Sequence, residues 1–243
     1  MDHERTRMIR SMIIPSLIIL ILWIIKLFEV IFNISLAEYG LYPLQIKGLP
    51  GIITSPLLHS DFSHLIANSI PLWLLCGLLF YFYRELAIKV LLLIYFITGI
   101  WVWFFARGDG VHIGASGVVY GLAAFLFLSG ILRRESKLMA ITLLITFLYG
   151  GMVWGVFPQF FPTQRISWES HLMGLLAGSV LALYYRKSGP QRKKYEWEYE
   201  DEDVDVDEED NQDHHDPLNE DLDKFTSSTG NKELRYRYPE NPE

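Results

Sequence analysis

The chain has 243 residues, 51% of them hydrophobic, and a formal net charge of −7. The charge is split along the chain: residues 1–195 carry 17 Lys and Arg against 9 Asp and Glu, whereas residues 196–243 carry 4 against 19. The single cysteine, Cys76, excludes an intramolecular disulfide and a cysteine-based metal cluster.

Six apolar segments follow one another in the first part of the chain. A helix that crosses a bilayer needs about 20 mostly apolar residues. The first segment is too long for a removable signal peptide and lacks a small-residue cleavage site, so we expect it to be retained. We predict an all-α polytopic membrane protein with six transmembrane helices, over residues 11–32, 62–83, 86–106, 113–132, 137–158 and 168–185.

Basic residues flank alternate ends of these spans. Thirteen Lys and Arg lie before the first span and after the second, fourth and sixth, against three in the other connections. Because basic loops stay on the cytoplasmic side, both termini are expected in the cytoplasm. Lys26, near the end of the first span, is expected to extend its ammonium group outward to the lipid headgroups.

Three polar clusters lie near the outer ends of the second, fourth and sixth spans. Polar groups are costly in hydrocarbon, so such clusters mark candidate functional sites. At 1.5 Å per residue, all three fall within about 10 Å of the outer surface. The clusters are His64 with Asn68, the segment Gly114-Ala115-Ser116-Gly117, and His171 with Gly174 and Gly178.

Ser116 is a candidate nucleophile, and His171 is the candidate base that would activate it. A serine flanked by glycines, or a strip of small residues, is by itself more typical of helix packing. Small residues on two facing helices let the backbones approach closely in a membrane, which would bring Ser116 within reach of His171. The facing strips are Gly117, Gly121 and Ala124 on the fourth span and Gly174 and Gly178 on the sixth.

His64 and Asn68 lie four residues apart and therefore share one helix face. Their side chains and the Ser116 backbone N–H could donate hydrogen bonds to an oxyanion. An interhelical polar pair is the structural alternative.

A metal site built from histidines is a minority alternative, because the spacing is irregular and no carboxylate shares a helical motif with them. We expect neither metal nor cofactor. The acidic residues at the span edges are interpreted as interfacial, which favours a Ser–His dyad without a carboxylate. The histidines concerned are His59, His64, His112 and His171, and the acidic residues are Asp61, Asp109 and Glu169.

Three motifs occur in a fixed order: HSDFSHLIAN at 59–68, GASGVVYG at 114–121 and SHLMGLLAG at 170–178. Over about residues 50–186 the chain resembles the rhomboid intramembrane serine proteases. The resemblance implies the six-helix bundle common in bacteria, catalysis by Ser116 and His171, and an oxyanion hole lined by His64 and Asn68. It also implies that Tyr120 packs against His171, with Gly114, Gly117, Gly174 and Gly178 in supporting positions.

The resemblance further implies substrates that are single-span proteins, cut near small and helix-weakening residues. The expected location is the bacterial plasma membrane, with a site that opens to the outer face. The covering element is expected in the loop 157–168, together with the outer end of the fifth span. Many relatives carry a Trp-Arg pair in the first long loop, but residues 33–57 contain neither, so that loop must be stabilised otherwise. Ser170 replaces a common alanine.

We expect a protease domain over residues 1–190 and a basic, then acidic, cytoplasmic tail over 191–243. Residues 196–223 hold 16 acidic groups and no Lys or Arg, a composition typical of a disordered segment. The preceding basic stretch is expected to face anionic lipid headgroups. The expected partners are transmembrane protein substrates and lipids, and not nucleic acid.

Two other functions stay open from the residues alone. A catalytically silent relative could bind transmembrane helices without cutting them. A small transporter could use the polar groups as a pathway, although such groups would then be distributed over the full depth of the membrane.

Overall fold

The computed structural model describes residues 2–108, 110–134, 136–148 and 167–188. The chain separates into two units, Met1–Arg192 and Lys193–Glu243, and every described residue belongs to the first. The predicted tail and most of the predicted covering loop 157–168 lie outside the described residues, as does the second half of the predicted fifth span.

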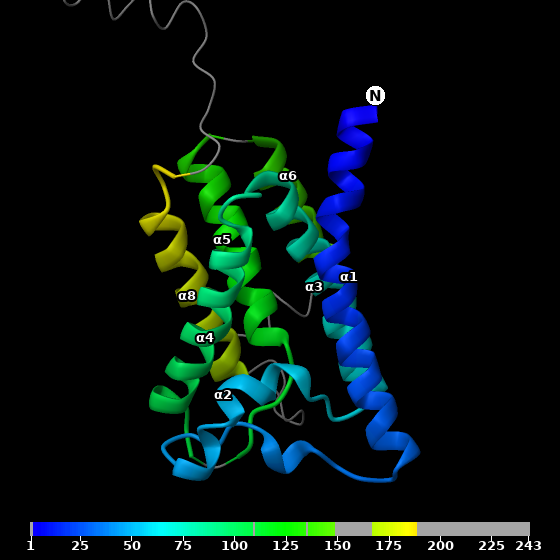
Figure 1. Cartoon of the computed structure of the whole chain (residues 1–243). Helices are drawn as coiled ribbons and strands as arrows, with labels where there is room; N and C mark the ends of the chain where they lie inside the picture. The colour runs from blue at the N-terminus through cyan, green and yellow to red at the C-terminus, as the bar shows by residue number, and fades with distance from the viewer. Residues whose placement is uncertain (1, 109, 135, 149–166, 189–243) are drawn as a thin grey trace, which may run out of the picture. The chain divides into compact units, whose positions relative to one another are not determined.

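Six helices occupy the apolar segments that the sequence singles out (Figure 1). Within the described ranges, the structure contains no strand beyond one isolated bridge. Three helical stretches are long and apolar enough to cross a membrane: His3–Ile31, Phe62–Phe82 and Ala87–Phe105. The remaining apolar helices are shorter as described, so six crossings stay a prediction. The six helices are α1 (Asp2–Ile31), α3 (Phe62–Phe82), α4 (Ala87–Phe105), α5 (Ser116–Leu132), α6 (Ser136–Leu148) and α8 (Trp168–Tyr184).

Helix α5 begins three residues later than the predicted span. Gly114 has a φ of +108°, which a right-handed helix does not accommodate and which glycine tolerates best. The helix therefore starts at Ser116. This start leaves the backbone N–H of Ser116 among the first four of the helix, which have no partner within it.

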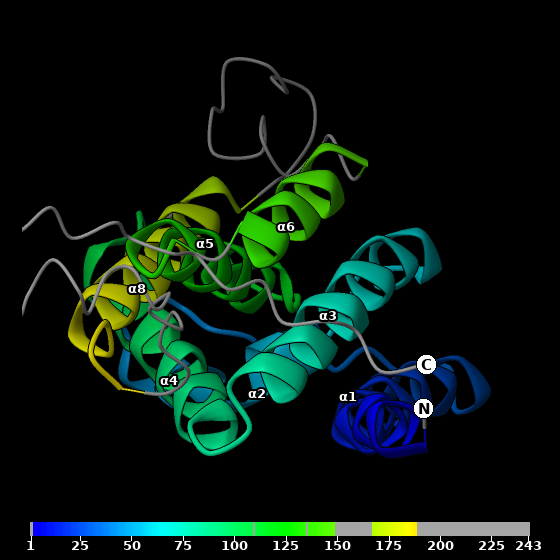
Figure 2. The same cartoon turned by 90° about the horizontal axis from the view of Figure 1, so that it is seen from above.

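Helix α5 lies at the centre of the bundle and contacts α3, α4, α6 and α8 (Figures 1 and 2). Its contact with α8 runs along the predicted small residues. A Cβ atom on Gly174 would overlap the carbonyl of Gly117, and one on Gly178 would overlap that of Gly121. The close approach of these two helices, predicted from the glycine spacing, is confirmed.

The connection between α1 and α3 folds into one short helix, α2 (Gly51–Thr54), and three 3₁₀ turns, Ala37–Tyr39, Ile46–Gly48 and Ser55–Leu57. Trp103 Nε1 on α4 donates to the carbonyl of Gln45 at 3.0 Å. Leu41 and His112 exchange backbone hydrogen bonds of 3.0 and 2.9 Å. These contacts anchor the loop that lacks the Trp-Arg pair.

The prediction that Lys26 extends outward is wrong. The residue is only 9% exposed, and its ammonium group lies 3.2 Å from Glu29 Oε2. It also donates to the carbonyls of His59 and Ser60, each at 3.0 Å. The buried carboxylate of Glu29 and the carbonyls of His59 and Ser60 offset the loss of hydration, so the side chain folds inward.

Candidate active site

Ser116 and His171 come together at the ends of two helices. Ser116 is the first residue of α5, and His171 lies in the first turn of α8. The glycine contact between the helices brings Ser116 Oγ to 2.9 Å from His171 Nε2. His171 is buried, with 7% of its surface exposed. This is the distance at which an imidazole can accept a hydroxyl proton.

Tyr120 supports the imidazole of His171 from one face. The two rings are stacked with their centroids 4.2 Å apart and their planes 9° from parallel. Tyr120 lies one turn after Ser116 on α5, so this helix carries both the hydroxyl and the aromatic surface that face His171.

His64 and Asn68 on α3 face the segment that precedes Ser116. A Cβ atom on Gly114 would lie 2.7 Å from His64 Nε2 and 3.6 Å from Asn68 Nδ2. Asn68 is buried and donates from Nδ2 to the carbonyl of His64 at 3.2 Å. The side chains of both residues therefore border the backbone at Gly114, close to the Ser116 N–H.

Two residues before α3 hold the other side of His64. Asp61 caps the helix, because its Oδ1 accepts the backbone N–H of His64 at 2.8 Å. Ser60 Oγ lies 2.7 Å from Asp61 Oδ2 and 3.2 Å from His64 Nδ1. The Ser60 hydroxyl, followed by the His64 N–H, lowers the pKa of Asp61 below its usual value.

This arrangement bears on the donor state of His64. A hydroxyl has one proton, so a Ser60 that donates to Asp61 accepts from His64 Nδ1. A neutral imidazole carries one N–H only, and donation from Nε2 as well requires the imidazolium. A Ser60 hydroxyl that donates instead to His64 Nδ1 leaves the single N–H of a neutral ring on Nε2, the nitrogen that faces Gly114.

His112 forms a link between the two halves of the site that sequence reasoning missed. Its Nδ1 lies 2.5 Å from Ser167 Oγ, which in turn lies 2.6 Å from Ser170 Oγ. His112 precedes Gly114 by two residues, and Ser170 precedes His171. The link therefore joins the segment before Ser116 to the start of α8. The only sequence signal was the nearness of these residues to the motifs.

Glu169, in the first turn of α8, is buried in the protein and paired with Arg107. The residue is 6% exposed, and its Oε1 lies 2.7 Å from Arg107 Nε. Burial beside a guanidinium keeps the carboxylate paired. The carboxylate thus forms an ion pair within the protein, two residues before His171.

The four histidines considered as metal ligands all lie in the described residues and are spread over different contacts. Within the described parts of the chain, no group of three His, Cys, Asp or Glu side chains is placed to hold a metal ion. His59 and His64 have ring centroids 5.0 Å apart, whereas His112 and His171 contact serines.

His59 lies just before α3 and is 3% exposed. Burial, followed by the nearby His64 and Lys26, lowers the pKa of His59 to about 4. The carbonyl of Leu57 and the carboxylate of Asp61 act in the opposite direction. The ring is therefore neutral at pH 7.

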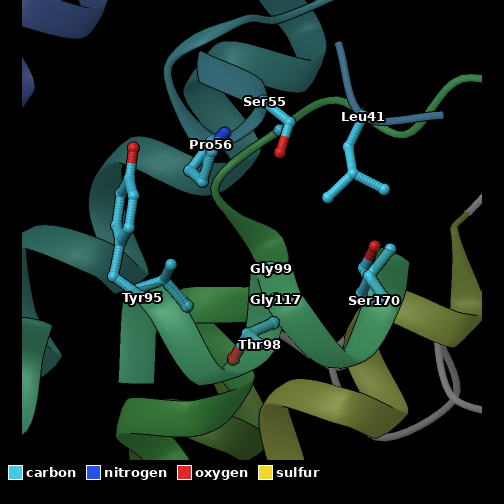
Figure 3. Close-up of a pocket in the computed structure, with 11 residues that line it drawn as sticks. Leu41, Ser55, Pro56, Tyr95, Thr98, Gly99, Gly117 and Ser170 are labelled. Carbon is cyan, nitrogen blue, oxygen red and sulfur yellow. The ribbon is translucent and has the colours of Figure 1, made fainter. Parts of the chain in front are cut away.

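A small cavity of about 20 Å³ adjoins the candidate site (Figure 3). Gly117 and Ser170 line it next to Ser116 and His171, and Thr98 lines it from α4. The volume is comparable to that of one water molecule and far too small for a peptide segment.

Comparisons with known proteins identify a matching family model and several relatives of the chain. Residues 47–188, more than half of the chain, match the family model of the Rhomboid domain. The uncharacterized protein Rv1337 of Mycobacterium tuberculosis (strain ATCC 25618 / H37Rv) is 34% identical over 178 residues, which cover 71% of this chain and 73% of that protein.

Two further relatives are similar over shorter or equal stretches. The uncharacterized protein ML1171 of Mycobacterium leprae (strain TN) is 33% identical over 178 residues, covering 71% of this chain and 70% of that protein. A Bacillus subtilis (strain 168) protein named "Putative rhomboid protease YdcA" is 32% identical over 140 residues, which cover 54% of this chain and 64% of that protein. The family match and the long apolar helices show that the chain is an integral membrane protein and belongs to the rhomboid family.

Proposed function

We propose that this protein is an intramembrane serine endopeptidase that hydrolyses peptide bonds in or near the transmembrane segments of other membrane proteins. The observation that carries the proposal is the 2.9 Å contact between Ser116 Oγ and His171 Nε2. Membership in the rhomboid family and similarity to a relative named for rhomboid proteases support it.

The reaction proceeds in two halves. His171 Nε2 accepts the hydroxyl proton while Ser116 Oγ attacks the substrate carbonyl carbon, and the carbonyl oxygen becomes an oxyanion. The C–N bond then breaks, His171 gives the proton to the leaving amine, and an acyl ester on Ser116 remains. In the second half, His171 takes a proton from water, the hydroxide attacks the ester, and Ser116 Oγ leaves and recovers the proton.

The oxyanion is stabilised by donors that surround Gly114. These are the backbone N–H of Ser116 at the start of α5 and the side chains of His64 and Asn68. Donors fixed before the reaction need no reorganisation as charge develops, which is why they lower the barrier. Gly114 is suited to this place because it carries no side chain where His64 and Asn68 approach.

The site opens toward the outer face of a bacterial plasma membrane, and both termini are cytoplasmic. This topology is supported by the excess of Lys and Arg at the cytoplasmic ends of the predicted spans. It leaves the site close enough to the outer surface for water to enter. The substrates are single-span proteins in which small, helix-weakening residues expose the bond to be cut. The protease domain comprises residues 1–190, followed by a solvated tail over 191–243.

The proposal is tested by cleavage of a reporter transmembrane substrate by the purified protein in detergent. Ser116→Ala and His171→Ala are each expected to abolish turnover, because nucleophile and base act as one unit. Ser179→Ala removes an exposed hydroxyl that donates to the carbonyl of Leu175 on the same helix, and it is expected to cleave like the wild type. Wild-type protein that binds the reporter without cutting it would instead support a catalytically silent binder.

A further inference from the structure

Lys26 lies at the centre of a polar contact between α1 and the segment that leads into α3. Its ammonium group has three hydrogens, and three acceptors surround it: Glu29 Oε2 at 3.2 Å and the carbonyls of His59 and Ser60 at 3.0 Å. Both Lys26 and Glu29 are at most 9% exposed. Every donor of the ammonium group is therefore used inside the protein.

Glu29 fixes the other end of this contact. Its Oε1 accepts the backbone N–H of Leu36 at 2.7 Å, while its Oε2 faces Lys26. The carboxylate thus connects the lysine to the start of the first loop. A buried ion pair retains its geometry only when the remaining polar atoms are satisfied, as they are here.

The segment that Lys26 holds is the same one that supports His64. Ser60 offers its carbonyl to Lys26 and places its hydroxyl 3.2 Å from His64 Nδ1. Asp61, the next residue, caps α3 through the His64 N–H. A displacement of the Ser60 backbone would therefore move two of the contacts that set the position of the His64 ring.

We propose that Lys26, paired with Glu29, is a positioning residue for the oxyanion hole. It holds the carbonyls of His59 and Ser60 so that the Ser60 hydroxyl keeps the His64 imidazole directed at Gly114. This inference rests on the proposed protease function. It also gives a role to a charged pair in α1, which lies beside α3 on the side away from α5 and α8 (Figure 2).

The test begins with two substitutions of Lys26 and two control variants, compared in steady-state cleavage of the reporter substrate well below their melting temperatures. Because the complete loss of an oxyanion donor costs about 100- to 1,000-fold, a misaligned donor in Lys26→Met is expected to lower kcat about tenfold. KM should stay within about twofold, because the substitution leaves unchanged the contacts that bind substrate equally in the ground state and the transition state. Lys26→Arg keeps the charge and several donors, and it should recover part of the lost kcat.

Two controls separate positioning from general stability. Trp23→Phe removes a different polar contact between α1 and α3, in which Trp23 Nε1 donates to Ser69 Oγ at 3.1 Å. It should lower the melting temperature and leave kcat unchanged. Lys47→Met makes the same substitution at an exposed lysine of the first loop and should behave like the wild type.

A double-mutant cycle with Ser60→Ala tests the route of the effect. If Lys26 acts through the Ser60 hydroxyl, Lys26→Met should lower kcat less than twofold in the Ser60→Ala background. A tenfold fall that persists in that background overturns the inference, and so does a Lys26→Met protein whose melting temperature falls while kcat is unchanged. An inactive wild-type protein would instead overturn the proposed function.

Discussion

Tyr120 lies flat against the imidazole of His171, with 4.2 Å between the ring centroids and 9° between the planes. The hydroxyl of Ser116 approaches the edge of the same imidazole at Nε2. One helix, α5, thus fixes both the plane of the candidate base and the position of its candidate nucleophile.

The stacked ring makes a prediction for substitutions at Tyr120. Tyr120→Phe retains the aromatic surface and should keep most of the cleavage rate. Tyr120→Ala removes a contact worth about 0.5–1.5 kcal/mol, so kcat should fall by up to about tenfold. The measurement is kcat for both variants, each at the same number of degrees below its own melting temperature. Equal rates for Phe and Ala would show that the stacking does not position His171.

Gly114 should tolerate no side chain. Gly114→Ala places a Cβ 2.7 Å from His64 Nε2, at a φ of +108° that other residues rarely adopt. We expect cleavage to fall by at least tenfold, because a strained residue of this kind costs about 1–3 kcal/mol and displaces His64. The matched control is Gly110→Ala, because a Cβ on Gly110 would meet nothing within 4 Å. Wild-type cleavage by Gly114→Ala would contradict the oxyanion-hole geometry.

His59 makes the stability of the protein depend on pH. Its pKa is lowered from 6.5 to about 4 by burial, so between these values the unfolded chain binds more protons than the folded one. The free energy of unfolding should therefore be highest above pH 6.5. It should decrease as the pH falls toward 4, by about 3 kcal/mol at most.

Melting temperatures of wild type and His59→Gln between pH 7 and pH 4.5 measure this contribution. The melting temperature of the wild type should decrease more between pH 7 and pH 4.5 than that of the variant. Parallel curves for the two proteins would mean that His59 is not the group responsible.

The acidic tail should be dispensable for chemistry. A chain that ends at Lys194 keeps every residue of the candidate site. In the proposed topology the tail is separated from the site by the bilayer core of about 30 Å. We expect cleavage within a few-fold of the full-length rate in detergent. A folded but inactive truncated protein would assign the tail a regulatory role.

The helices and the approach of α5 to α8 could be predicted because they depend on local composition. An apolar run specifies a span, and glycines at matching positions specify which faces meet. The nearness of Ser116 to His171 follows from those two facts. The late start of α5 could not be predicted, because it depends on the positive φ of Gly114. A glycine in the sequence allows a positive φ but does not show that one is adopted.

The polar contacts around the site could not be predicted in the same way. A lysine near the end of a span suits outward extension as well as an inward ion pair, although Glu29 at the i+3 position was a usable signal. Arg107 and Glu169 are 62 residues apart in sequence, and His112 and Ser167 are 55 apart. Such pairs depend on how loops return to the bundle, and no local pattern encodes that path.

The most direct test of the central claim is labelling by a fluorophosphonate probe, with the modified residue identified by mass spectrometry of the purified protein. The probe requires an activated serine and no knowledge of the natural substrate. We predict that the wild type is labelled on Ser116, that Ser116→Ala is not labelled, and that His171→Ala reacts at least 100-fold more slowly. Labelling of another residue, or equal labelling rates with and without His171, would contradict the assignment of Ser116 and His171 as nucleophile and base.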